Sequence, residues 1–133
     1  HNPVLMESDN FKLVLAIASS LGHIFPPYLK FKGGKGVATL LGAVIGIHWQ
    51  TALLALTVFI IVLMFSKFVS LASICASVSF PLILIFVFKV ETTSLIVFSV
   101  VAPIAVIVTH RSNIKRLLKG QEPRAPVFAD KKE

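Results

Sequence analysis

Residues 51–88 of the chain read TALLALTVFIIVLMFSKFVSLASICASVSFPLILIFVF, and this stretch decides the fold. Its one polar break, Ser66-Lys67, separates two apolar segments, residues 51–65 and residues 69–88. Such segments are typical of helices that cross a bilayer, whose apolar core of about 30 Å needs about 20 helical residues. Pro81 is expected to kink the second segment. The sequence therefore predicts an integral membrane protein built from helices.

Three further apolar segments flank this stretch. Residues 11–25 form the first, which Pro26-Pro27 ends because proline lacks an N–H and disfavours helix in the residue before it. Residues 37–47 are too short to cross alone at about 1.5 Å per residue, so they must tilt, extend into their flanks or form a half-helix. Residues 94–109 form the last. We expect an all-α polytopic transmembrane bundle with about five membrane segments, one of them short.

The composition agrees with this class, because 56% of the 133 residues are hydrophobic and only 14% are charged. The bundle is expected to be one domain over residues 1–133, with residues 110–133 as a basic cytoplasmic tail. The single cysteine, Cys75, cannot form an intrachain disulfide. No group of Cys, His and carboxylate residues has metal-ligand spacing, so no metal and no cofactor is predicted. Basic loops without interleaved aromatic residues argue against nucleic acid as a partner.

Positive charge is distributed unevenly between the two ends of the predicted helices. If the segments alternate across the membrane, Lys12 and Lys89 lie on one side and the rest of the 13 lysines and arginines on the other. Loops rich in these residues stay in the cytoplasm, so the N-terminus is predicted to be external and the C-terminus cytoplasmic. Topology and anionic lipid headgroups would explain this charge without any substrate, and that alternative stays open.

A glycine-rich loop, Phe31-Lys32-Gly33-Gly34-Lys35-Gly36-Val37-Ala38-Thr39, falls on the predicted cytoplasmic face. Its glycines let backbone N–H groups turn toward an anion, and a helix starting at Val37 adds the positive end of its dipole. The nucleotide-binding P-loop is excluded, because Leu29 replaces its first glycine and Gly36 its hydroxyl residue. The loop predicts a phosphate site with Lys35 as ion-pair partner, or else a flexible turn with snorkelling lysines.

A second group of polar residues follows the last apolar segment. Residues 109–122 are expected to form a short amphipathic helix that Gly120 ends. His110 and Asn113 are three residues apart on one face, so their side chains could hold one hydroxyl or phosphate. Arg116 extends this face by another turn. Each residue also has a structural explanation, as an interfacial side chain, a helix cap or a lipid anchor.

Two serines at the cytoplasmic start of the fourth segment, Ser70 and Ser73, offer further hydroxyl groups. Serines within membrane helices usually donate to their own backbone, which is the alternative explanation.

Three motifs, in this order, resemble the acyl-phosphate:glycerol-3-phosphate acyltransferase family, known as PlsY. They are Gly22-His23-Ile24-Phe25-Pro26 running into Phe31-Lys32-Gly33-Gly34-Lys35-Gly36-Val37-Ala38-Thr39, then Val69-Ser70-Leu71-Ala72-Ser73-Ile74, then His110-x-x-Asn113-Ile114-x-Arg116-Leu117-Leu118-x-Gly120-x-Glu122. The resemblance covers nearly the whole chain, but it corresponds to the C-terminal portion of a family member. The family's first cytoplasmic motif, a Ser/Gly/Asn-rich loop followed by an arginine, has no counterpart here. With His1 in place of a methionine, we expect a fragment or a processed product.

The resemblance implies a bacterial inner-membrane enzyme of phospholipid biosynthesis. Such an enzyme moves a fatty acyl group from acyl phosphate to the 1-hydroxyl of glycerol 3-phosphate, and releases lysophosphatidic acid and phosphate. By motif, the implied catalytic residues are Lys35 and His110. The implied substrate-binding residues are Gly33, Gly34, Lys35, Gly36, Thr39, Ser73, His110, Asn113 and Arg116. Glu122 is expected to hold the tail in place.

The resemblance suggests that a substrate phosphate takes the hydroxyl proton, and His110 as general base is the rival assignment. The other large class of glycerolipid acyltransferases pairs a histidine with an aspartate five residues later, and none of the four histidines has one. Two alternatives remain. The chain could be a small phosphate or anion transporter, although its spans offer few polar residues, or a catalytically inactive truncated fragment.

Overall fold

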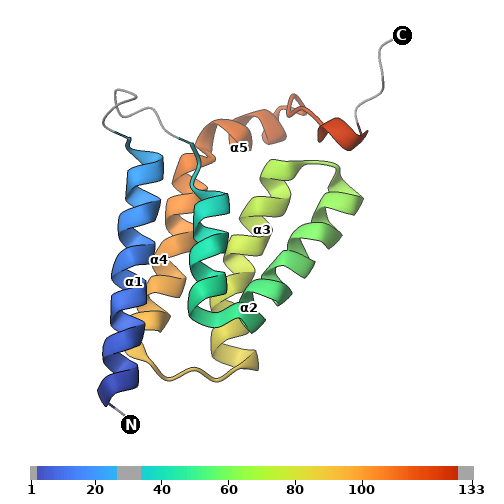
Figure 1. Cartoon of the computed structure of the whole chain (residues 1–133). Helices are drawn as coiled ribbons and strands as arrows, with labels where there is room; N and C mark the ends of the chain where they lie inside the picture. Colours follow the sequence, from blue (N-terminus) through green and yellow to red (C-terminus); the bar gives the residue numbers. More distant parts are fainter. Residues whose placement is uncertain (1–2, 27–33, 129–133) are drawn as a thin grey trace.

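The computed structural model describes residues 3–26 and 34–128, and the regular elements in this part of the chain are all helices, without strands. The helices are α1 (Pro3–Ile24), α2 (Val37–Ser66), α3 (Val69–Leu82), η2 (Ile83–Val87), α4 (Thr93–Thr109), α5 (Arg111–Leu118) and η3 (Pro126–Phe128). Figure 1 shows the long helices standing side by side while α5 lies across one end of the bundle. The predicted all-α bundle is confirmed.

Helix α2 consists of two arms that meet at His48, where the backbone leaves the helical region (φ −150°, ψ 80°). In Figure 1 the chain descends through the first arm and climbs back through the second, so both ends of α2 lie at the same end of the bundle. The Nδ1 atom of His48 accepts the N–H of Thr51 at 3.3 Å, as an N-cap side chain does at the start of a helix. Residues 37–47 therefore form the half-helix that the sequence allowed.

The five predicted apolar segments correspond, in order, to α1, the first arm of α2, the second arm of α2, α3 with η2, and α4. Helix α1 begins at Pro3 rather than near residue 11. By length and hydropathy, two helices of the described residues can span a membrane, Val37–Ser66 and Val69–Val87. The bent pair of α4 and α5 makes a third candidate. Pro81 does not end α3, which continues into a π-helical turn at η2.

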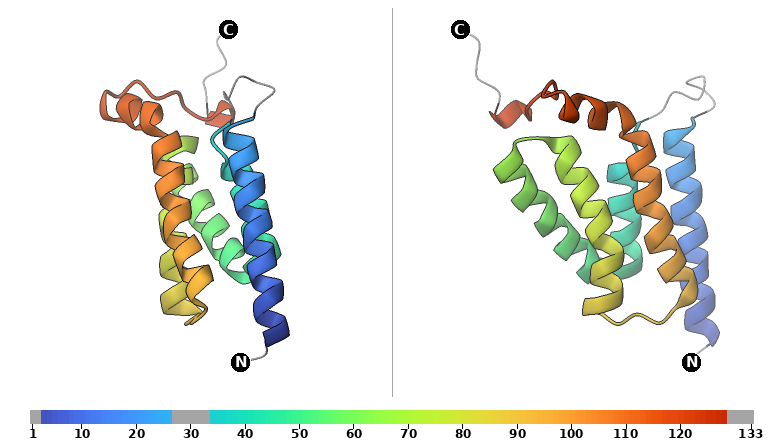
Figure 2. Two further views of the ribbon diagram at one scale, coloured as in Figure 1. Left: turned by 90° about the vertical axis from the view of Figure 1, so that its left-hand side faces the viewer. Right: turned by 180° about the vertical axis from the view of Figure 1, so that it is seen from behind.

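The chain alternates between the two ends of the bundle (Figures 1 and 2), which is the arrangement assumed when the cations were assigned to two sides. Lys35, the turn at Lys67 and α5 share one end, and the turn at Lys89 lies at the opposite end (Figures 1 and 2). The assignment of the first end to the cytoplasm stays a prediction.

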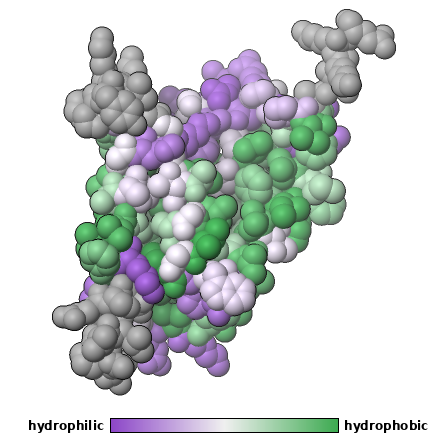
Figure 3. Space-filling model, viewed as in Figure 1, coloured by the Kyte–Doolittle hydropathy of each residue, from purple (hydrophilic) through white to green (hydrophobic). Residues whose placement is uncertain are grey.

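The core lies where α1, both arms of α2, α3 and α4 meet. Its buried apolar members are Leu13, Ala16, Val44, Ala52, Phe80, Leu84, Leu95, Phe98 and Ala102. Large apolar side chains also cover the outside, among them Phe65 and Phe86, which are 86% and 72% exposed. In Figure 3, hydrophobic side chains occupy the middle of the visible face and hydrophilic ones gather toward its ends. A surface of this kind suits contact with lipid rather than water.

Candidate functional site

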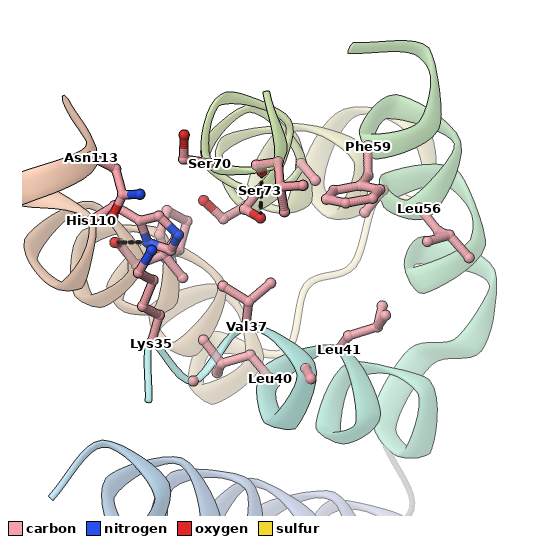
Figure 4. Close-up of a pocket in the computed structure, with 18 of the residues that line it drawn as sticks. Lys35, Val37, Leu40, Leu41, Leu56, Phe59, Ser70, Ser73, His110 and Asn113 are labelled. Carbon is pink, nitrogen blue, oxygen red and sulfur yellow. Dashed lines mark hydrogen bonds between the residues drawn. The ribbon is translucent and has the colours of Figure 1, made fainter. Parts of the chain in front are cut away.

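A cavity of about 800 Å³ lies between α2, α3 and α4, below α5. Its polar lining comes from the end of α1, the loop before α2, α3 and the chain from His110 onward, and consists of His23, Lys35, Ser70, Ser73, Ser77, His110, Asn113, Glu122 and Arg124. Its apolar wall includes Leu40, Leu41, Val44, Leu56, Phe59, Phe80 and Val106. Figure 4 shows Lys35, His110 and Asn113 on one side of this space and Leu56 and Phe59 on another. The cavity is thus amphipathic, with charge and hydrogen-bonding groups apart from an apolar wall.

The glycine–lysine loop is fixed to its neighbours by backbone contacts. Gly36 caps α2 with φ 74°, a left-handed conformation that favours glycine, and its C=O accepts the Leu40 N–H at 2.8 Å. The Gly34 N–H donates to the His23 C=O at 3.2 Å, which joins the loop to the end of α1. The Lys35 C=O accepts the Thr109 hydroxyl at 3.2 Å, which joins it to the end of α4. Lys35 is consequently held at the edge of the cavity.

His110 lies at the junction of α4 and α5, whose axes differ by 62°. It is 2% exposed, and its Nδ1–H donates to the Val106 C=O at 2.8 Å. A neutral ring that donates from Nδ1 carries its lone pair on Nε2. Figure 4 shows the Lys35 side chain extending toward this ring. His110 therefore combines a fixed orientation with one nitrogen that can accept a proton.

Glu122 is the centre of a hydrogen-bond network that joins α3 to α5. Its Oε1 accepts the Ser70 hydroxyl and the Asn113 Nδ2–H, each at 2.7 Å, and its Oε2 accepts the Arg116 Nε–H at 2.8 Å. Burial favours the neutral acid, but the three hydrogen bonds and the Arg116 charge outweigh it and lower the pKa of Glu122. Glu122 is thus a carboxylate whose oxygens are already engaged.

The chain after α5 crosses the mouth of the cavity, and we name residues 119–126 the strap. Gly120 (φ 66°) ends α5 by a Schellman motif, in which the Gln121 N–H donates to the Arg116 C=O at 2.8 Å. The end of the helix at Gly120 is as predicted, although α5 is shorter than residues 109–122. Further along, the Ala125 N–H donates to the Lys67 C=O at 2.8 Å. Glu122 and Ala125 therefore attach the strap to α3 and to the α2–α3 turn.

The predicted site residues divide into two groups. Those that line the cavity are Lys35, Gly36, Ser73, His110 and Asn113. Gly34, Thr39 and Arg116 are not part of the lining, and Gly33 falls outside the described residues. His110 precedes α5 rather than sharing a helix face with Asn113, yet both side chains are buried at the cavity. Their roles in binding remain predictions.

The two serines of α3 behave differently. Ser73 donates to the Val69 C=O of its own helix at 2.9 Å, whereas Ser70 donates to Glu122.

Sequence reasoning gave no role to His23, Thr109 or Arg124, although His23 belongs to a quoted motif and lines the cavity. Thr109 and Arg124 carried no separate signal, because their contacts depend on how the elements pack.

The fold and the cavity define an all-helical membrane protein with an amphipathic site. The chain belongs to the glycerol-3-phosphate acyltransferase family, whose model matches residues 3–120. The glycerol-3-phosphate acyltransferase of Prochlorococcus marinus strain NATL2A is 43% identical over 122 residues, covering 90% of this chain and 62% of the relative. That of Endomicrobium trichonymphae is 40% identical over 124 residues, covering 93% of this chain and 61% of the relative.

The fold is also similar to a crystal structure of PlsY (YgiH), an integral membrane glycerol 3-phosphate acyltransferase, in its glycerol 3-phosphate form. The two share 38% identity with a TM-score of 0.79, over 88% of this chain and 61% of the other. The lysophosphatidic acid form of that protein gives a TM-score of 0.77 at 40% identity, over 84% of this chain and 58% of the other. The chain thus spans less than two thirds of the length of these relatives.

Proposed function

We propose that this chain supplies an acyl-transfer site, where a fatty acyl group passes from acyl phosphate to the 1-hydroxyl of glycerol 3-phosphate. The observation that carries the proposal is the amphipathic cavity, because both the acyl donor and the product join an apolar chain to a phosphate-bearing head. Crystal forms of a similar protein with glycerol 3-phosphate and with lysophosphatidic acid support these ligands. The site faces the cytoplasm of a bacterial inner membrane, as the cation distribution favours.

The polar end of the cavity holds the phosphate of glycerol 3-phosphate. Lys35 offers a positive charge there, and Gly36 precedes the first arm of α2, whose N-terminus favours an anion. His110 and Asn113 lie nearby, and they orient the glycerol hydroxyl toward the acyl carbon. Glu122 positions Asn113 and holds the strap, since its oxygens are engaged with Ser70, Asn113 and Arg116.

The reaction needs little covalent help from the protein. The 1-hydroxyl oxygen attacks the acyl carbon, the bond between that carbon and the phosphate oxygen breaks, and phosphate leaves. The hydroxyl proton passes to a substrate phosphate. Because phosphate is a good leaving group, orientation and charge neutralisation supply much of the rate. His110 is the rival proton acceptor through Nε2, since its Nδ1 is engaged with Val106.

The test is turnover by the purified chain in lipid vesicles supplied with palmitoyl phosphate and glycerol 3-phosphate. Phosphate release matched by lysophosphatidic acid is the expected result, with large losses in Lys35→Ala and His110→Gln. Lys115→Ala is the matched control, since Lys115 is an exposed cation at the same end that does not line the cavity. Undiminished turnover in both site variants would contradict the site.

Two other outcomes separate the alternatives. Phosphate uptake into sealed vesicles without lysophosphatidic acid would favour a transporter. Absence of turnover, reversed by adding the upstream segment of a longer relative, would show that this chain holds only part of the site.

A further inference from the structure

Two cationic side chains line the cavity, and the segments that carry them are held by different backbone contacts. Among the lysines and arginines of the described residues, Lys35 and Arg124 belong to the lining. The backbone of Lys35 is tied to the end of α4 through Thr109. Arg124 lies in the strap, directly before Ala125, whose N–H bonds to Lys67 at the α2–α3 turn. The two cations are thus anchored at separate sides of the mouth, beside α4 and beside the α2–α3 turn.

Arg124 has no carboxylate partner among the described side chains. The acidic residue of the strap, Glu122, is paired with Arg116 instead. Arg124 is exposed, and the strap is held on both sides of it, at Glu122 and at Ala125. Because an arginine stays charged at any physiological pH, a positive charge without a carboxylate partner among the described residues is held at the mouth of the cavity.

One part of the apolar wall runs toward the side where Arg124 is attached. Leu56 and Phe59 lie in the second arm of α2, which runs up to the turn at Lys67, and Phe80 faces the cavity from α3. Figure 4 shows Leu56 and Phe59 across the space from Lys35. The first arm of α2 adds Leu40, Leu41 and Val44 on the side of the glycine–lysine loop. A fatty chain packed along the second arm would place its phosphate end near the strap.

We infer that Arg124 binds the phosphate of the acyl phosphate, while the loop at Lys35 binds the phosphate of glycerol 3-phosphate. This assignment rests on the proposed function. Two phosphate groups that meet at one mouth repel each other, so each requires its own cation. A guanidinium suits this role because its planar donors match phosphate oxygens in pairs.

The test measures binding rather than turnover, on the whole chain in lipid nanodiscs by calorimetry. The probes are glycerol 3-phosphate and an acylmethylphosphonate, in which a methylene group replaces the bridging oxygen of acyl phosphate. Arg124→Gln is expected to raise the Kd of the phosphonate about tenfold and to change that of glycerol 3-phosphate less than about twofold. Lys119→Gln is the matched control, an exposed strap cation outside the lining, and is expected to change neither.

If Arg124→Gln and Lys119→Gln weaken the binding of both probes to the same extent, the inference is overturned, because general surface charge would then explain the effect. It is also overturned if Arg124→Gln weakens the binding of glycerol 3-phosphate alone, or if the native chain does not bind the phosphonate. Arg124→Lys should give an intermediate Kd, since lysine keeps the charge but not the paired donors. The strap's bond to Lys67 uses backbone atoms, so these variants should keep their thermal stability. Tight phosphonate binding without turnover would contradict the proposed activity alone.

Discussion

The imidazole of His23 fills the space into which a side chain at position 34 would project. A Cβ added to Gly34 would overlap the Nε2 atom of His23, and the Gly34 N–H also donates to the His23 C=O at 3.2 Å. A side chain at position 34 would therefore require the His23 ring or the loop to move. This close approach favours glycine at position 34, and it places His23 against the loop next to Lys35.

Gly34→Ala is expected to displace the loop and to raise the KM for glycerol 3-phosphate several-fold. His23→Ala combined with Gly34→Ala removes the overlap, so the double variant should recover part of this loss. Turnover assays of the two single variants and the double variant measure the coupling. Gly22→Ala is the control, because nothing lies within 4 Å of a Cβ there. Simple additivity of the two losses would show that the contact does not set the loop's position.

Gly36 and Gly120 both have positive φ but differ in their surroundings. Gly36 has φ 74°, and its added Cβ would lie 3.1 Å from the Ile24 side chain, whereas Gly120 has φ 66° and open space. Alanine at either position should lower the free energy of unfolding by about 1–2 kcal/mol through backbone strain. Gly36→Ala should lose more than Gly120→Ala in thermal unfolding, because Ile24 must also move. The reverse order would contradict this account of the packing.

Thr109 links the end of α4 to the loop. Its hydroxyl lies 3.2 Å from the Lys35 C=O and 2.9 Å from the Val106 C=O. Thr109→Val removes this donor at nearly constant volume, at a loss of about 1 kcal/mol, and should raise the KM for glycerol 3-phosphate. Thr109→Ser should retain native kinetics. Thr57→Val is the control, since Thr57 donates to the Leu53 C=O within α2. If Thr57→Val raises the KM as much as Thr109→Val does, the contact between Thr109 and the loop is not the cause.

The network around Glu122 should make the attachment of the strap sensitive to acid. The pKa of Glu122 is lowered in the folded protein from an ordinary value of 4.5, so its stabilisation is complete above that pH. The stabilisation is lost as the pH falls through the lowered pKa of the folded state. The difference in melting temperature between the native chain and Glu122→Gln should therefore shrink between pH 7 and pH 3. A constant difference over this range would contradict the role of the carboxylate.

His48 stabilises the turn between the arms of α2. Because its Nδ1 caps the second arm through the Thr51 N–H, His48→Ala should lower the free energy of unfolding by about 1 kcal/mol. His48→Asn should recover most of this loss, since asparagine is a good N-cap. Chemical denaturation of the three proteins provides the comparison, and equal losses in both variants would point to the ring contact with Phe88 instead.

Much of the fold follows from local features of the chain. The apolar runs, the short segment at residues 37–47 and the polar break at Ser66-Lys67 predicted the number and order of the helical segments, although α1 begins earlier than expected. The left-handed glycine after α5 also marked the end of that helix. These features are legible because segment length, hydropathy and glycine conformation depend on residues close together in sequence.

Local sequence features predict an all-α membrane bundle, a loop with the composition of an anion site, and a cation-rich end. They do not predict that Ser70 donates to Glu122 while Ser73 donates to its own helix, or that Thr109 donates to the loop, because these contacts appear only when the helices pack. The tertiary structure also showed Arg124 beside the cavity and Arg116 committed to Glu122. The physical reason is that hydrogen bonds and ion pairs depend on distances of a few ångströms between residues far apart in the chain. Such distances arise only when the helices pack.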